Sequence, residues 1–484
     1  MPLQAQSNNI YCNSNLVKTW GAPGYLSLPP VSPAAFRSLS DPNTVGSVAS
    51  ADFVSLSTST HNLFTVASGQ TSQGLAWLDL EEEEDNDPEG VRGFLCIAPI
   101  LDRNAKANSL PFVLHCYSQW AITTVFEPLK IVHTLREQVI SQFSSEDTRT
   151  RTVLIANVMN MFAKNCAIDG PRKSILNHLA LDLQKSGSSF MASPPSLPLE
   201  LDRKNAIQRL DSMLEILGLQ MDTQPLRDST RSLTYTASIF RRACSEPPGK
   251  PINLPNILLG PSINLRYFAT IDIFMSVITG QSTHFQYEVP FSLELCEQMY
   301  QWQLRGNYGL QWLYGFPDQF IMLFAWINTL SETPGAGNDA GLISWIENQL
   351  PQIKVAIDES GDPSLRIGRM VLCKVDARDS RVVSAQKGFM RLVRGVKAGR
   401  MPDVHLVTSM LVAGVATIEE RDRETLRQRI LNVRECADRG TGGNDIMMNL
   451  EDIWARTMDE GRAAVWLDLR IAYSRLTGSL ATYV

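Results

Sequence analysis

Residues 261–280 read PSINLRYFATIDIFMSVITG and carry the clearest secondary-structure pattern in the chain. Proline favours the first turn of a helix and glycine the position just beyond its last turn, so Pro261 and Gly280 mark the two ends. Between these ends the apolar side chains recur at helical spacings, at Leu265, Phe268, Phe274, Met275 and Ile278. The stretch therefore predicts one helix that presents an apolar face to a core.

Comparable patterns occur on both sides of this helix. Pro317–Asp318 opens a stretch whose apolar residues follow the spacing i, i+3, i+4, i+7 and i+10, and Pro334–Gly335 ends it. Further helices are predicted over 124–143, over 207–217 with Gly218 as the end, after a cap at Asn444 or Asp445, and from Trp466 to Gly478. Because stretches of period-two alternation are scarce, the sequence predicts an all-α fold.

The 484 residues divide by composition into two parts. Residues 1–90 are Ser/Pro-rich and then acidic, and such a composition buries too little apolar surface to offset chain entropy, so we expect disorder there. Residues 91–478 have the texture of one large helical domain. Within it, the stretch SGSSFMASPPSLPLE at 186–200 predicts a long internal loop.

Charge and cysteine usage limit the classes of function. Residues 1–90 hold two basic and ten acidic residues, whereas the remaining residues hold 42 basic and 40 acidic ones. This near-neutral body lacks the basic footprint of a nucleic-acid-binding domain. The chain shows no signal peptide and no apolar run long enough to span a membrane, and its eight cysteines are scattered. We therefore expect an intracellular, soluble protein.

Motifs that carry chemistry are scarce in the sequence. There is no Cys-x-x-Cys pair, no phosphate-binding glycine loop, no Gly-x-Ser-x-Gly elbow and no His-Glu-x-x-His motif. His115 and Cys116 are adjacent, but neighbouring side chains on one element point apart. We therefore predict no catalytic, cofactor-binding or metal-ligating residues, and we predict that the chain is not an enzyme.

Two groups of residues are candidate contact sites. Arg391, Arg394, Lys397 and Arg400 are spaced by three, so they share a face if 386–397 is helical. That face would bind phosphate or an acidic partner, or it would be only a solvated basic surface near the negative end of a helix. The second group, Leu75, Trp77, Leu78 and Leu80, precedes the acidic run at 81–85 and is typical of an acidic–hydrophobic docking segment or of a solvated linker.

Long strings of the chain resemble the fungal-specific transcription factor domain, the helical region of fungal zinc binuclear-cluster regulators. They are LDRNAKANSLPFVL (101–114), RRACSEPPGKPINLP (241–255), LRYFATIDIFMSVITGQ (265–281), GLQWLYGFPDQFIMLFAWINTLSE (309–332), FMRLVRGVKAGRMPDVHLV (389–407), RILNVRECADRGTGGNDIMMNLEDIWAR (429–456) and GRAAVWLDLRIAYSRLTG (461–478). The resemblance spans most of residues 88–478.

The resemblance implies a transcription-regulatory domain that acts through protein or effector contacts in the nucleus, with the cytoplasm as the alternative location. Two departures bear on that implication. The six clustered cysteines of a zinc cluster are absent, since Cys12 stands alone among the first 95 residues, so zinc and sequence-specific DNA binding are expected only of relatives that carry the cluster. Compared with the family, a helical stretch is missing between Cys373 and Asp376. It is absent from the protein itself, or it was lost through a gene-model error.

Two further interpretations remain open after the resemblance. The chain would be a helical scaffold or interaction protein with no direct transcriptional role if it has lost that role together with its zinc cluster. It would also dimerise if the short join at 373–376 leaves apolar surface uncovered on neighbouring helices. No membrane partner is expected.

The acidic–hydrophobic segment generates a prediction. Self-repulsion of Glu81–Asp85 keeps the segment extended, so Trp77 and Leu80 stay available to anchor in a partner groove. Residues 70–92, fused to a neutral DNA-binding module, should raise the output of a reporter gene, and the double variant Trp77→Ala, Leu80→Ala should lower it again. A silent fusion, or a double variant that activates equally well, would show that the segment is only a linker.

Overall fold

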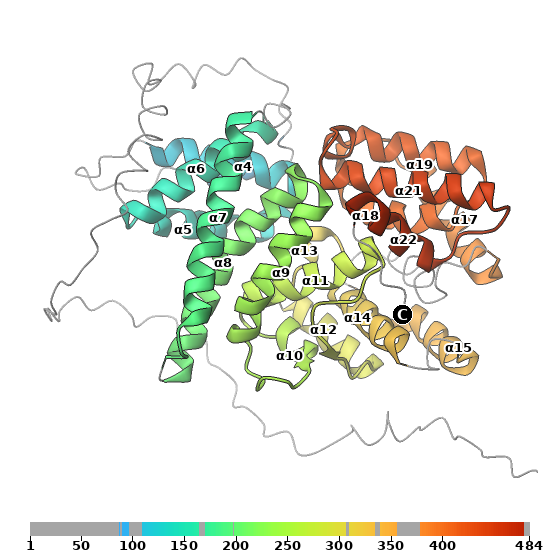
Figure 1. Ribbon diagram of the computed structural model, residues 1–484, viewed down its shortest axis with the longest axis horizontal. Helices are drawn as coiled ribbons and strands as arrows, with labels where there is room; N and C mark the ends of the chain where they lie inside the picture. Colours follow the sequence, from blue (N-terminus) through green and yellow to red (C-terminus); the bar gives the residue numbers. More distant parts are fainter. Residues whose placement is uncertain are drawn as a thin grey trace, which may run out of the picture. The chain divides into compact units, whose positions relative to one another are not determined.

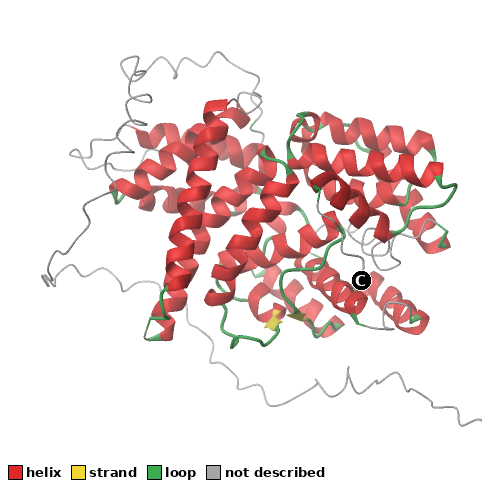
Figure 2. Ribbon diagram, in the orientation of Figure 1, coloured by secondary structure: helices red, strands yellow, loops and turns green. Residues whose placement is uncertain are grey.

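The computed structural model describes residues 87, 90–95, 109–163, 170–196, 198–305, 309–333, 339–355 and 378–478. The chain divides into two units, Met1–Pro88 and Glu89–Val484, and all helices of the described part belong to the second unit. That part contains 19 α-helices and a single pair of two-residue strands (Figure 2). The predicted all-α fold is confirmed. The predicted disorder of residues 1–90 falls almost wholly outside the described residues.

The first group of helices precedes the central part of the unit. Its members are α3 (Val91–Leu95), α4 (Ser109–Thr124), the 3-10 turn η3 (Pro128–Lys130), α5 (Val132–Gln142), α6 (Glu146–Ala163) and α7 (Gly170–Ala192). The apolar faces of α4, α5, α6 and α7 share a core with α8 (Leu199–Thr223). One connection of this group to the rest of the unit is α8, which packs against α7 on one side and α9 (Leu226–Ala243) on another. A second is a small core in which Val91, Ala121 and Val132 pack with residues 310–313.

The middle and last groups share the larger core. The middle group continues with β1 (Ile252–Asn253), α10 (Leu254–Leu258), α11 (Ile263–Thr279), β2 (Tyr287–Glu288), α12 (Leu293–Leu304), α13 (Gln311–Tyr314), α14 (Asp318–Glu332), α15 (Ala340–Gln349) and the 3-10 turn η5 (Leu350–Gln352). The last group, orange to red in Figure 1, is α17 (Ser380–Gly395), α18 (Arg400–Val415), α19 (Glu420–Asn432), α20 (Arg434–Ala437), α21 (Gly442–Asp459) and α22 (Trp466–Thr477). The strands pair in parallel, with Ile252 opposite Tyr287.

Helix α11 is the most enclosed helix of the larger core. Twelve consecutive residues, Phe268–Thr279, are buried, because α8, α9, α10, α14, α18 and α22 all pack against it. Buried polar groups need internal partners. Asp272, which is 1% exposed, accepts hydrogen bonds from His284 (backbone N at 2.9 Å and Nδ1 at 2.8 Å) and from the Tyr287 hydroxyl at 2.9 Å. The loop that leads to β2 is thereby tied to α11.

Three predicted helices are confirmed. Helix α11 begins after the Ser262 cap and ends at Gly280, whose φ of +65° suits glycine. An added Cβ at Gly280 would also lie 2.9 Å from the backbone nitrogen of Arg470, so no other residue fits this helix end easily. Helix α14 begins at Asp318, and α22 ends at Gly478 with a φ of +66°.

Four local predictions are wrong. Residues 124–143 form no single helix, because the chain turns after α4 and helix resumes at Val132. Helix α8 continues past Gly218, where the missing side chain makes room: a Cβ would lie 2.9 Å from the Tyr267 hydroxyl. The loop predicted at 186–200 is shorter, since α7 extends to Ala192 and α8 starts at Leu199. The cap of α21 is Thr441, not Asn444 or Asp445.

Among the described helices, none is both long enough and apolar enough to cross a bilayer. The stretch around the join at 373–376 lies outside the described residues.

A buried ion pair between α18 and α19 generates a stability prediction. Asp403, fully buried, binds Arg429, which is 6% exposed and also donates to the Val396 carbonyl at 2.6 Å. Removing one partner strands a buried charge, so Asp403→Ala should lower the free energy of unfolding by about 3–5 kcal/mol in urea titrations. Glu297→Ala, which removes the exposed pair with Lys354, should change the free energy of unfolding far less. Equal costs for the two variants would contradict this assignment.

Candidate functional site

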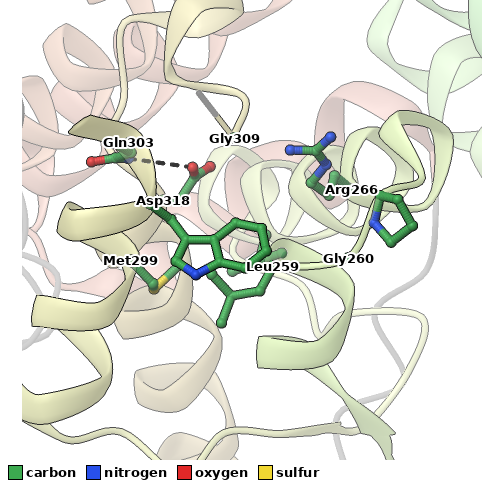
Figure 3. Close-up of a pocket in the computed structure, with 10 residues that line it drawn as sticks. Leu259, Gly260, Arg266, Met299, Gln303, Gly309 and Asp318 are labelled. Atoms are coloured by element: carbon green, nitrogen blue, oxygen red, sulfur yellow. Dashed lines mark hydrogen bonds between the residues drawn. The ribbon is translucent and has the colours of Figure 1, made fainter. Parts of the chain in front are cut away.

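A pocket of about 270 Å³ lies beside the start of α11. Its walls come from the link between α10 and α11, from one face of α12 and from the start of α14 (Figure 3). Figure 3 shows two charged side chains, Arg266 of α11 and Asp318 of α14, on opposite sides of this pocket. We call this feature the Arg266–Asp318 pocket.

Arg266 stands in the first turn of α11, just before the fully buried stretch begins. Its side chain is half-buried, and no described residue forms a hydrogen bond or an ion pair with its guanidinium; the buried Nε has no partner at all. Burial lowers the pKa of Arg266, while the nearby charge of Asp318 opposes that shift. A guanidinium stays charged in proteins, so this side chain is a partly buried cation whose Nε donor has no acceptor among the described residues.

Asp318 is the first residue of α14 and is 3% exposed. Its Oδ1 accepts from the backbone nitrogen of Leu310 at 3.1 Å, and its Oδ2 faces the Gln303 amide nitrogen at 3.5 Å, the dashed line in Figure 3. Gly309, with a φ of +53°, packs against the carboxyl so closely that a Cβ would lie 1.5 Å from Oδ2. Burial raises the pKa of Asp318 to about 6, although Leu310, Arg266 and Gln303 oppose the rise.

Apolar side chains form the remaining walls of the Arg266–Asp318 pocket. Leu258 and Met299 are almost fully buried, and the Trp302 ring is 42% exposed at the rim. The described lining residues include no serine, threonine, cysteine, histidine or lysine. The arrangement suits the binding of a small molecule through opposite charges and an apolar surface, which is the usual composition of a ligand pocket.

A second polar feature runs along α8 and was missed by the sequence analysis. Three acidic residues lie along one side of this helix: Glu215 follows Asp211 by four residues, and Asp222 follows Glu215 by seven. Burial raises the pKa of Glu215 and of Asp222 to about 7. The Tyr117 hydroxyl of α4 donates to Glu215, and Gln138 of α5 donates to Asp211 at 3.3 Å. Acidic groups therefore occupy the boundary between the first group of helices and α8.

The far end of this acidic row meets two tyrosines and an ion pair. Asp222 accepts no hydrogen bond from the described residues, and the charges of Glu435 and Arg400 act on it in opposite directions. Tyr267 and Tyr314 stack with ring centres 6.1 Å apart, and burial raises the pKa of Tyr267 to about 12. Burial also raises the pKa of Tyr314, so both hydroxyls stay protonated at neutral pH.

The predicted basic face at 391–400 is wrong as a single surface. Helix α17 ends at Gly395, so Arg391 and Arg394 lie on it, whereas Lys397 follows it and Arg400 starts α18. Arg394 forms an ion pair with Asp422. Arg400 donates to the Glu435 carboxylate at 2.6 Å and to the Thr123 carbonyl at 2.9 Å. Two of the four cations are thus structural bridges between helices.

The other predicted sites divide as follows. Leu75, Trp77, Leu78 and Leu80 lie outside the described residues. Within the described part, no group of three or more His, Cys, Asp and Glu side chains is arranged to hold a metal ion. Burial raises the pKa of Cys244, Cys296 and Cys436 to about 12, so these thiols are not ionised at neutral pH.

Comparison with known proteins gives no assignment. No family model matches the chain. No curated protein and no solved structure matches it either. The resemblance to the fungal-specific transcription factor domain stays a prediction.

The raised pKa of Glu215 generates a prediction about pH. An unfolded chain ionises this carboxyl near pH 4.3, but the folded chain does so near 7, so stability falls as pH rises between these values. Glu215→Gln should remove up to about 3 kcal/mol of that fall, measured by urea unfolding at pH 5 and pH 7.5. Glu332→Gln, at an exposed carboxyl of α14, is the control. A Glu215→Gln profile parallel to that of the control would contradict the buried assignment.

Proposed function

We propose that this chain is the helical regulatory domain of a fungal zinc-cluster-type transcription factor relative, that it works without a DNA-binding zinc cluster of its own, and that it responds to a small effector. The resemblance of the long strings between residues 101 and 478 supports the transcriptional part of the proposal. The all-α fold is compatible with that resemblance but is shared by many other proteins.

The observation that carries the effector part is the guanidinium of Arg266 in the Arg266–Asp318 pocket, whose buried Nε has no acceptor among the described residues. A buried donor without an acceptor costs about 1–3 kcal/mol, so a ligand oxygen that bonds to Nε would remove this cost. Two opposite charges beside apolar side chains are the usual composition of a ligand pocket, which supports binding as the role of this site.

The pocket is also connected to the rest of the domain through the packing of α11. Arg266 belongs to α11, and α11 packs against helices of the last group, α18 and α22, as well as against α8 and α14. A ligand that binds one arrangement of these helices more tightly than another would shift the population toward it. In this proposal, the shift rearranges a surface of the domain, and that surface binds a protein partner of the transcription machinery in the nucleus.

A reporter assay tests the proposed function. The full chain, fused to a heterologous DNA-binding module in a fungal host, should change reporter output and accumulate in the nucleus. Arg266→Gln should alter that output by at least about twofold at equal protein level, because the effector contact is lost. Arg391→Gln, an exposed arginine of α17 outside the pocket, is the matched control and should behave as the parent.

Two results would contradict the proposal. A fusion with no effect on output under any growth condition would favour the alternative of a helical scaffold without a transcriptional role. An output that is changed equally by Arg266→Gln and by Arg391→Gln would remove the pocket from the account.

A further inference from the structure

We propose that the Arg266–Asp318 pocket binds a small zwitterion of the amino-acid class, with the ligand carboxylate on Arg266, its ammonium group on Asp318 and an apolar side chain against Met299 and Trp302. This inference rests on the proposed function, since it names the chemical class of the effector. It is argued from the charges, the geometry and the apolar walls of the pocket.

The carboxylate end follows from Arg266. A guanidinium offers a planar fork of N–H donors that matches a carboxylate in two parallel hydrogen bonds. In the described part of the chain no acceptor occupies that fork, and the buried Nε is unsatisfied. Asp318 lines the same pocket but forms no ion pair with Arg266. The charge of Asp318 thus acts on Arg266 without direct contact, and the donors of the guanidinium remain open to a ligand carboxylate.

The ammonium end follows from Asp318. Of its two carboxyl oxygens, Oδ1 receives the 3.1 Å hydrogen bond from Leu310, while Oδ2 receives from the described residues only the 3.5 Å contact with Gln303. A carboxylate accepts about four hydrogen bonds, so Asp318 keeps acceptor capacity on the pocket side. A cation placed there would replace the solvent that burial has removed. An ammonium group is the simplest donor that supplies both a proton and a positive charge.

The two charges also explain why a zwitterion fits better than a ligand of one sign. An anion alone would satisfy Arg266 but would bring a second negative charge toward the Asp318 carboxyl. An amine alone would satisfy Asp318 but would bring a second positive charge toward Arg266. Like charges brought together in a partly buried site repel each other strongly. A ligand that carries both charges avoids both penalties.

The size and the walls of the pocket set the rest of the ligand. A volume of about 270 Å³ is slightly below the usual range for drug-sized molecules, so the ligand is a small metabolite. Leu258 and Met299 give buried apolar contacts, and the Trp302 ring at the rim offers a flat face for an aliphatic or aromatic group. These walls favour an amino acid with an apolar side chain over a charged one.

Calorimetry on the full chain tests the inference. The probes are L-leucine and L-phenylalanine, together with phenethylamine and 3-phenylpropanoate, which each keep only one of the two charges of phenylalanine. At least one of the two amino acids should bind, and phenylalanine, if bound, at least about tenfold more tightly than either one-charge analogue. Quenching or a shift of Trp302 fluorescence should accompany binding and should be lost in Trp302→Phe.

Variants locate the two contacts. Arg266→Gln should weaken amino-acid binding at least about tenfold, and Arg266→Lys, which keeps the charge but not the fork, should weaken it as well. Asp318→Asn should weaken binding of the amino acid but not of 3-phenylpropanoate. Arg391→Gln should bind as the parent does. Far-UV circular dichroism and thermal unfolding establish that each variant is folded, and the lysine variant keeps the test valid if glutamine disrupts packing.

Three outcomes would overturn the inference: no amino acid bound at concentrations up to about 1 mM, equal binding of a one-charge analogue, or parental affinity in both Arg266 variants. The proposed function fails separately. Amino-acid binding without any effect on reporter output would leave the ligand class standing and remove the regulatory role. A pocket-dependent reporter response without amino-acid binding would leave the regulatory role standing and remove the ligand class.

Discussion

The enclosure of α11 is the constraint on which the larger core depends. Over its twelve consecutive buried residues this helix has no solvent-facing side, so neighbours must cover that whole circumference, and the buried polar side chains need internal partners. Asp272, Ser276 and Thr279 form hydrogen bonds, whereas the Thr270 hydroxyl has no partner among the described residues. The contacts of Asp272 with His284 and Tyr287 meet that requirement on one side. The close approach of Arg470 to Gly280 meets it at the helix end, where only a glycine lets α22 come near enough.

The polar features lie where this enclosure begins. Arg266 and Tyr267 are the last two residues before the buried stretch, and they serve different neighbours. Arg266 lines the pocket with Asp318, whereas the Tyr267 hydroxyl packs against Gly218 of α8 and its ring stacks on Tyr314. A rigid, fully packed helix thus holds one cation and one phenol in fixed positions. Preorganisation of this kind lowers the cost of binding a ligand, because little has to be ordered when the ligand arrives.

Sequence reasoning predicted the parts that local chemistry controls. Pro261 with Gly280 marked α11, Pro317 marked the start of α14, and Gly478 marked the end of α22, because proline and glycine act through their own backbones. Sequence reasoning failed where a residue from a distant part of the chain determines the local structure. Gly218 looks like a helix end, but its role is to admit Tyr267 from another helix, so α8 continues.

The candidate site was less accessible to such reasoning. The spacing of Asp211, Glu215 and Asp222 is visible in the sequence, but a charged row on a helix usually faces solvent. Only the contacts with α4, α5 and α11 show that this row is half-buried. Arg266 in an otherwise apolar helix is a signal that could have been used. Asp318, which lines the same pocket, was predicted only as the start of a helix. The pocket exists because three separate segments meet, and no local pattern encodes that meeting.

Hydrogen–deuterium exchange of the full chain, followed by mass spectrometry, tests most directly whether α11 is the fixed element that holds both polar features. Peptides that cover residues 268–279 should exchange most slowly of the described helices, at the rate of global unfolding. Those from α5 and α19, which pack on fewer sides, should exchange faster by local opening. If α11 exchanges as fast as α5 and α19, the helix is not a rigid support, and the account of the pocket built on it is contradicted.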